Sequence, residues 1–505
     1  MIQKIGNIWL AFIAAISAIF GMIYSVCNVD SHHWGFVAGT ALDYLHGKKF
    51  FSDIYVQYGV GEPLLFKLLS PVVGIDYTSI GVLTSLAYSL NLVLIYLNVK
   101  KLSSTPFAVL ISALAILLHT YAIFPWPDYY AGVFISLACY LIIGEGKEKQ
   151  FLRFALAGLC LFLAFIFRNT YLFGFIATAI SYAGIAMLNR GTWNKNLVVM
   201  IATLFSLVLA YLVFLISQGT LLSWYHQITG ASMYSFGLSS LIAPIRNAFF
   251  PPKFYLPNNI VLTTLSALLY LSLSVSLRAF RSKELKGTTV FFALLGLSGL
   301  IQTTAIYDVF RIQNASSSLY LVLAIVLHSR YPNFFQTQLK KRWLQVALAY
   351  FFLLLILKIP HASTYNPVYS GELQSYSKSD IRFFGEHRFQ EDRLKYYEEL
   401  SRTLCDGKRK IVNLTMDSTI PYLCVDQENA LALPFYMEPL LASVDPVKLE
   451  RVKTGDFNSD EVIVSSAPVA SNPKVTLTLI KQITGPVVNG YSGTISIFYA
   501  ERKEP

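Results

Sequence analysis

The chain of 505 residues is 54% hydrophobic and only 14% charged, with a mean hydropathy of +0.51. Soluble proteins carry about 25% charged residues, so this composition excludes a water-soluble fold and predicts a mainly α-helical, polytopic membrane protein. The formal net charge of +11 is explained by Lys and Arg in cytoplasmic loops that face anionic lipid. We therefore expect membrane lipids, and no nucleic acid, as partners.

The first apolar segment covers residues 8–26 and follows a lysine, as the core of a signal peptide would. It is longer than a typical signal-peptide core and no small-residue cleavage motif follows it, so we interpret it as a retained transmembrane span. In all, eleven apolar segments approach the length needed to cross about 30 Å of hydrocarbon. They are residues 8–26, 79–98, 106–124, 129–144, 152–167, 171–187, 197–217, 260–277, 289–306, 315–329 and 343–359.

Basic residues gather in alternate loops between these spans. Positive loops stay in the cytoplasm, so the pattern predicts a multi-pass protein of the plasma (inner) membrane with a cytoplasmic N-terminus. Eleven spans then place the C-terminus outside the cytoplasm. The outer face carries the loop at 27–78, the segment at 218–258 and the chain after about residue 360.

Composition changes near residue 360, which predicts two domains: a transmembrane domain at 1–360 and a small extracytoplasmic α/β domain at 361–505. Residues 380–404 have helical spacing, and four segments alternate like strands. The strand-like segments are 410–414, 461–465, 475–480 and 494–499.

Cys405 and Cys424 both lie in this outer domain. A disulfide between them would add about 3 kcal/mol by chain-entropy arguments, and two buried thiols are the alternative. The sequence contains no Cys or His spacing that suggests zinc and no glycine-rich phosphate loop.

The loop at 27–78 has an unusual concentration of polar groups between two predicted surface helices, residues 34–45 and 62–73. Aromatic residues between the helices suit the level of lipid head groups. We expect this loop to hold a lipid head group against the bundle. Its acidic and histidine residues are Asp30, Asp43, Asp53, His32, His33 and His46.

The segments DSHHWG (30–35) and SDIYVQYG (52–59) resemble the D-x-x-H-x-G … R-D-x-x-x-Q-Y-G pattern of a bacterial branch of the GT-C membrane glycosyltransferases. That superfamily includes the protein O-mannosyltransferases. The aspartate after the first span, the two surface helices and the outer C-terminal domain are similar as well. The resemblance covers about 360 residues of this chain.

The resemblance implies an inverting transfer of sugar from a polyprenyl-phosphate donor to a glycan, lipid or protein acceptor on the outer face. Asp30 matches the family's general base, which takes the proton of the acceptor hydroxyl; a helix N-cap is its alternative role. Asp53 is the second carboxylate, and it either orients the acceptor, acts as the base itself or closes a turn. His32, His33, Gln57 and Tyr58 are the predicted pocket residues.

Arg168 and Arg311 lie at outer ends of spans, against the positive-inside trend. The resemblance implies that they bind the donor phosphate, where cations stabilise the departing charge. Snorkelling is the alternative for Arg168, and an ion pair with Asp308 is the alternative for Arg311. Relatives often have an acidic residue after the first arginine, whereas this chain has Asn169.

The sequence also allows a metal site and other functions. A divalent metal held by Asp30 and the two histidines is one option, although no cofactor is required. Asp128 lies on the same face, where we interpret it as a cap at a loop tip. A flippase or transporter of lipid-linked glycans and an oligosaccharide polymerase or ligase are the rival functions. The spans lack repeated central charges and an evident inverted repeat, which favours the transferase over the flippase.

Overall fold

The computed structural model describes most of the chain. Asp30, Arg311, the eleventh predicted span at 343–359 and the predicted domain boundary near residue 360 all lie outside the described residues. The described residues are 2–27, 31–119, 125–144, 149–189, 193–233, 256–281, 286–299, 317–330, 375–405, 409–424, 427–488 and 491–503.

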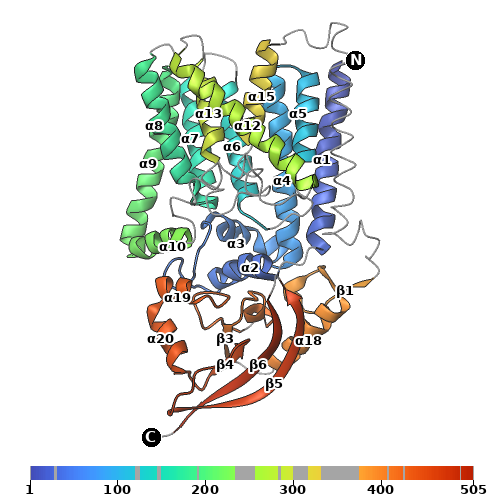
Figure 1. Cartoon of the computed structure of the whole chain (residues 1–505), viewed down its shortest axis with the longest axis vertical. Coiled ribbons are helices and arrows are strands. Elements are labelled where there is room, and N and C mark those ends of the chain that lie inside the picture. Colours follow the sequence, from blue (N-terminus) through green and yellow to red (C-terminus); the bar gives the residue numbers. More distant parts are fainter. Residues whose placement is uncertain are drawn as a thin grey trace.

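Apolar helices stand side by side in a bundle, with the N-terminus at one end and the C-terminal region at the other (Figure 1). Five of them are long and apolar enough to cross a membrane: α1 (Ile2–Cys27), α4 (Tyr77–Leu102), α7 (Gln150–Phe167), α8 (Tyr171–Leu188) and α9 (Lys195–Ser217). Shorter apolar stretches lie in α5 (Thr105–Leu118), α6 (Asp128–Ile143), α12 (Leu256–Arg281), α13 (Gly287–Ser298) and α15 (Ser317–Arg330). Each falls on one of the first ten predicted spans, which confirms the polytopic fold class, while the total of eleven stays a prediction.

The two predicted surface helices are present as α2 (Ser31–Leu45) and α3 (Gly61–Val73). They lie between the bundle and the C-terminal region (Figure 1). α3 buries a face that carries Glu62 and Phe66 and exposes Leu68 and Val72. A third short helix, α10 (Leu221–Met233), lies at the same end of the bundle.

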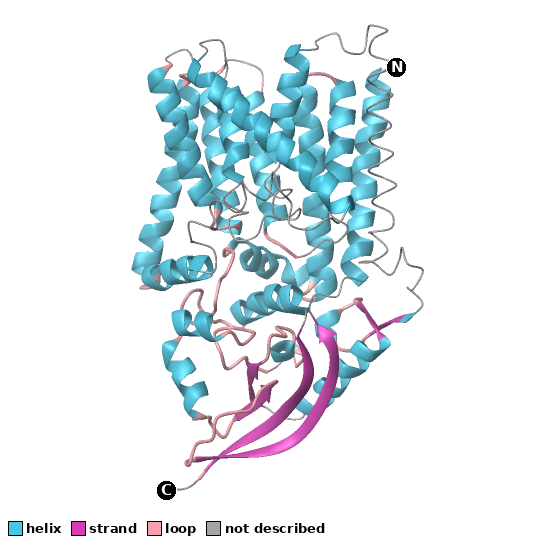
Figure 2. Cartoon of the chain, viewed as in Figure 1, coloured by secondary structure: helices cyan, strands magenta, loops and turns pink. Residues whose placement is uncertain are grey.

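The C-terminal region combines helices with a four-stranded sheet of order β3-β4-β6-β5, in which β3 and β4 are parallel and the other pairs antiparallel (Figure 2). The four predicted strand segments are confirmed. The elements are β1 (Tyr376–Lys378), η4 (Arg382–Phe384), β2 (Arg388–Gln390), α18 (Glu391–Leu404), β3 (Lys410–Leu414), η5 (Ile420–Tyr422), α19 (Glu438–Val444), α20 (Pro446–Thr454), β4 (Glu461–Ser465), β5 (Val475–Val488) and β6 (Tyr491–Arg502).

The helix predicted at 380–404 begins only at Glu391, because Gly385 takes a positive φ of 59° and the next residues pair as β2 with β1. Cys405 and Cys424 form a disulfide, which settles the choice that the sequence left open. It joins the end of α18 to the residues after η5.

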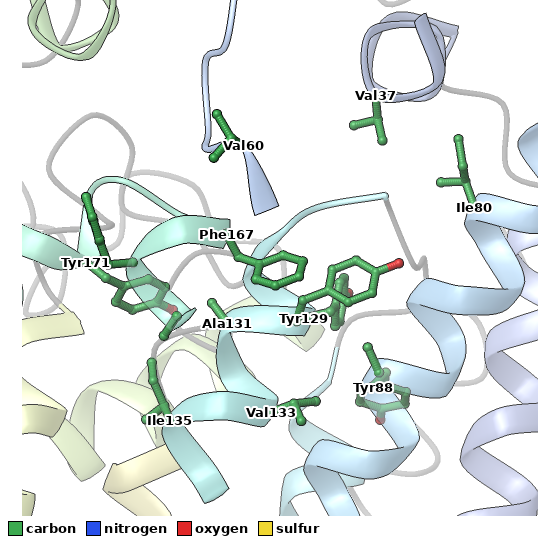
Figure 3. Close-up of a cluster of buried hydrophobic side chains, with 14 of the residues drawn as sticks. Val37, Val60, Ile80, Tyr88, Tyr129, Ala131, Val133, Ile135, Phe167 and Tyr171 are labelled. Carbon is green, nitrogen blue, oxygen red and sulfur yellow. The ribbon is translucent and has the colours of Figure 1, made fainter. Parts of the chain in front are cut away.

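A continuous hydrophobic core runs from the bundle through α2 into the C-terminal region. Figure 3 shows part of it, where Val37 of α2 and Val60 lie above Phe167 of α7 and Tyr129 of α6, and Tyr88 of α4 lies deeper in the bundle. The burial of these side chains in one core holds α2, the 56–61 loop and the helix ends in position. The candidate site is built on these elements.

Candidate functional site

The loop at 56–61 is pressed onto the end of α7. A Cβ on Gly59 would lie 2.7 Å from the carbonyl oxygen of Phe167, so a larger residue does not fit there. The backbone N–H of Asn169 donates a 2.6 Å hydrogen bond to the carbonyl of Tyr58. These contacts fix Tyr58 beside the first residue after α7, which is Arg168.

Arg168 is held between an aromatic ring and a carboxylate. Its guanidinium carbon lies 4.5 Å from the centre of the Tyr58 ring, a distance at which a cation is attracted by the ring face. Its Nη1 lies 3.6 Å from Oδ2 of Asp128, the first residue of α6. The two side chains are 16% and 4% exposed. The guanidinium of Arg168, the predicted phosphate-binding group, therefore lies in an enclosed site and is largely shielded from solvent.

Glu62 is the second carboxylate of this cluster. It lies in the first turn of α3, is 3% exposed, and its Oε1 accepts no hydrogen bond from the described residues. Burial raises the pKa of Glu62 well above its ordinary value; the negative charge of Asp128 raises it further, and Arg168 lowers it. Glu62 is therefore electrostatically coupled to both members of the ion pair.

Glu62 also opens onto a pocket beneath α2. The predicted pocket residues Gln57 and Tyr58 lie in its wall together with Gly59. The remaining lining residues are Phe36, Val37, Thr40, Val56 and Pro63. A buried carboxylate, one oxygen of which accepts no hydrogen bond from the described residues, in a small pocket beside a cation is an arrangement suited to proton transfer and to binding an anion.

The two predicted histidines face different parts of the protein. The His33 ring lies 5.6 Å from that of Trp126, in the turn that leads into α6 and Asp128. The Nδ1 of His32 lies 3.2 Å from Oγ of Ser418 and 3.3 Å from the carbonyl oxygen of Met416. His33 thus lies on the bundle side of α2, whereas His32 joins α2 to the C-terminal region.

Asp53 lies at the surface, in contrast to the buried Glu62 and Asp128. Its carboxylate is exposed and accepts the backbone N–H of Lys49 at 2.9 Å, as a residue that closes a turn does. This geometry favours the turn role that the sequence left open for Asp53. Asp30 belongs to the residues that the structure does not describe, and it directly precedes Ser31, where α2 begins.

Sequence reasoning missed Glu62 and gave Asp128 a minor role. A first-turn glutamate is typical of helix N-termini, so its place in the helix does not by itself mark Glu62 as buried. The available signal was its position directly after the QYGVG segment, at the start of an otherwise apolar helix. Across the described ranges, no three His, Cys, Asp or Glu side chains gather closely enough to hold a metal ion.

Comparison with known proteins gives a fold and no sequence family. No family model matches the sequence, and no curated protein matches it. The structure is similar to the crystal structure of ArnT from Cupriavidus metallidurans bound to undecaprenyl phosphate, with 10% sequence identity and a TM-score of 0.57 over 97% of this chain and 98% of ArnT. The oligosaccharyltransferase AglB from Archaeoglobus fulgidus, in complex with an inhibitory peptide and a dolichol-phosphate, matches with 10% identity and a TM-score of 0.44 over 91% of this chain and 69% of AglB.

The likeness to ArnT extends over nearly the whole of both chains, so the C-terminal region belongs to the shared architecture. The chain is thus an integral membrane protein with the GT-C fold that the sequence resemblance implied.

Proposed function

We propose that this protein is a membrane glycosyltransferase that moves a sugar from a polyprenyl-phosphate-linked donor to an acceptor hydroxyl. The observation that carries the proposal is the enclosed cluster of Glu62, Asp128 and Arg168 at the end of the bundle covered by α2 and α3. The proposal is also supported by the fold that this chain shares with ArnT, whose crystal structure contains undecaprenyl phosphate.

Arg168 is the group proposed to bind the donor phosphate. When the bond between the anomeric carbon and the phosphate oxygen breaks, the lipid phosphate takes the electron pair and gains negative charge. A guanidinium presents several N–H donors in a planar fork that matches phosphate oxygens. Tyr58 and Asp128 hold this fork in place before the reaction begins, which is how an enzyme stabilises developing charge. Arg311 stays the proposed second phosphate ligand.

A carboxylate must accept the proton as the acceptor oxygen attacks the anomeric carbon. Glu62 is the candidate that the described residues supply, because its raised pKa brings it nearer to the operating pH, where a general base is most effective. Asp30 remains the base proposed from the sequence resemblance. A single displacement of this kind inverts the anomeric centre.

We place the chemistry on the outer face of the membrane. The N-terminus and the C-terminal region lie at opposite ends of the molecule (Figure 1). α4 starts beside the C-terminal region, where the Thr78 hydroxyl accepts the backbone N–H of Glu386 at 2.6 Å, and it ends with Lys100 and Lys101. Its 26 residues span roughly 40 Å, so these lysines lie at the opposite face. We assign that face to the cytoplasm, because positively charged loop residues are retained there.

The test uses membranes that contain the full chain and undecaprenyl-phosphate carrying a radiolabelled hexose. We expect release of undecaprenyl phosphate and movement of the label into a glycan, lipid or protein fraction, and we expect Arg168→Ala to abolish both. A wild-type protein that carries the labelled lipid across the bilayer without breaking its sugar–phosphate bond would show that the flippase rival is correct.

A further inference from the structure

One face of α2 is in backbone contact with the C-terminal region. Gly35, Gly39 and Asp43 are spaced by four residues and so share this face. A Cβ on Gly35 would lie 2.5 Å from the backbone of Ser418, and a Cβ on Gly39 would overlap the ring of Tyr422. We call the contacting residues, 415–424 and 427–436, the clamp.

Buried polar bonds anchor the clamp to the same face. The Tyr422 hydroxyl donates to Oδ2 of Asp43 at 2.9 Å, and the Lys48 ammonium donates to Oδ1 of Asp43 at 2.7 Å. Lys48 also donates to the carbonyl of Asn429 at 2.9 Å. Asp43 is only 3% exposed, so its charge depends on these partners, and removing one of them leaves an uncompensated buried group.

The neighbouring face of α2 forms part of the wall of the candidate site. Phe36 and Thr40 line the pocket onto which Glu62 opens. The Phe36 ring lies 5.8 Å from the ring of Tyr58, and Tyr58 in turn stacks against Arg168. A shift of α2 would therefore move the wall of the pocket and the support of the phosphate-binding cation together.

The disulfide fixes the clamp at its middle. Cys424 lies two residues beyond Tyr422, and its partner Cys405 is the C-cap of α18. The clamp is thereby tied at one point to a helix of the C-terminal region and at another to α2. Loss of the disulfide frees the residues beside Tyr422.

We propose that the clamp positions α2 for sugar transfer and that Tyr422 and Asp43 are its positioning residues. We also propose that a dithiol reductant lowers the transfer rate, because it cleaves the Cys405–Cys424 S–S bond to two thiols while it is itself oxidised to a disulfide. This inference rests on the proposed glycosyltransferase function. It assigns a role in the reaction to residues almost 400 positions from α2 in the sequence.

The first test is a steric double-mutant cycle. Gly39→Ala should lower kcat for transfer from undecaprenyl-phosphate hexose roughly tenfold to a hundredfold, because small misplacements cost that much, while KM for the donor changes little. In a Tyr422→Ala background the added methyl group meets no ring, so the same substitution should change kcat by less than about twofold. Gly184→Ala in α8 is the matched control, since nothing lies within 4 Å of its added Cβ.

Hydrogen exchange of α2 and of residues 415–424 separates positioning from unfolding. Gly39→Ala should raise exchange in these two segments and leave α7 and α8 unchanged. Equal kcat losses from Gly39→Ala in both backgrounds would overturn the proposed contact. Wild-type-like kcat for Gly39→Ala, with exchange raised in α2, would overturn the positioning role.

The second test is redox. Cys405→Ser and mild reduction of the wild-type protein should lower kcat by a similar factor, and Cys139→Ser, in the bundle, should not. Full activity of the reduced protein would refute the redox dependence. If wild-type protein shows no transfer at all, the proposed function fails, whereas the effect of Cys405→Ser on hydrogen exchange still tests the clamp.

Discussion

Replacing Asp128 with Asn tests whether the ion pair with Arg168 organises the site. At the 3.6 Å separation of Nη1 and Oδ2, two unit charges attract by about 5 kcal/mol at an effective dielectric constant of about 20. Arg168 keeps 16% exposure, so water offsets part of this loss. We expect Asp128→Asn to lower the free energy of unfolding by about 2–3 kcal/mol. It should also lower kcat/KM for sugar transfer roughly a hundredfold, equivalent to about 2.7 kcal/mol.

The measurement pairs thermal unfolding in detergent with the radiolabelled transfer assay. The control is the double variant Asp128→Asn with Arg168→Met, which removes both charges. It should regain part of the lost stability, because no uncompensated charge of the former ion pair stays buried, and it should stay inactive. Recovery of transfer in the double variant, or wild-type transfer in Asp128→Asn, would refute the reasoning.

The remaining predictions concern the same cluster. Because burial raises the pKa of Glu62, the acid limb of the transfer rate should lie above the ordinary glutamate pKa of about 4.3, and Asp128→Asn should move this limb to lower pH. As pH rises above the ordinary glutamate pKa, Glu62 loses its proton in the unfolded chain before it does so in the folded protein. The free energy of unfolding should therefore fall between the ordinary pKa and the raised pKa of the folded protein, and Glu62→Gln should remove that fall. Arg168→Lys should keep the charge yet lower transfer roughly tenfold, because a lysine lacks the planar fork and the stacking on Tyr58. Asp53→Asn should keep near-wild-type transfer in the same assay. A loss comparable to that of Arg168→Lys would show that Asp53 takes part in the reaction.

Hydropathy and periodicity predicted most of the fold, because both depend on local sequence. The ten described apolar helices and the four strands follow from apolar runs and alternation. The prediction of a helix at 380–404 was wrong for its first half. There, the positive φ of Gly385 and the pairing of β2 with β1 override the helical spacing of the sequence.

The site was predictable only in part. Arg168 could be found because a cation at a predicted outer end of a span breaks the predicted charge trend. The importance of Glu62 arises from burial, which depends on how Gly59 packs against α7. The link between Asp43 and Tyr422 joins residues 379 positions apart, and no local pattern encodes such a contact.

The most direct test of the account is the transfer rate of Glu62→Gln, measured with saturating undecaprenyl-phosphate hexose alongside Asp30→Asn. Glutamine keeps the shape of the side chain and cannot accept the proton, so we predict a loss of roughly a hundredfold or more with donor binding retained. Full activity of Glu62→Gln together with an inactive Asp30→Asn would assign the base to Asp30. Full activity of both variants would contradict the proposal that this cluster carries out sugar transfer.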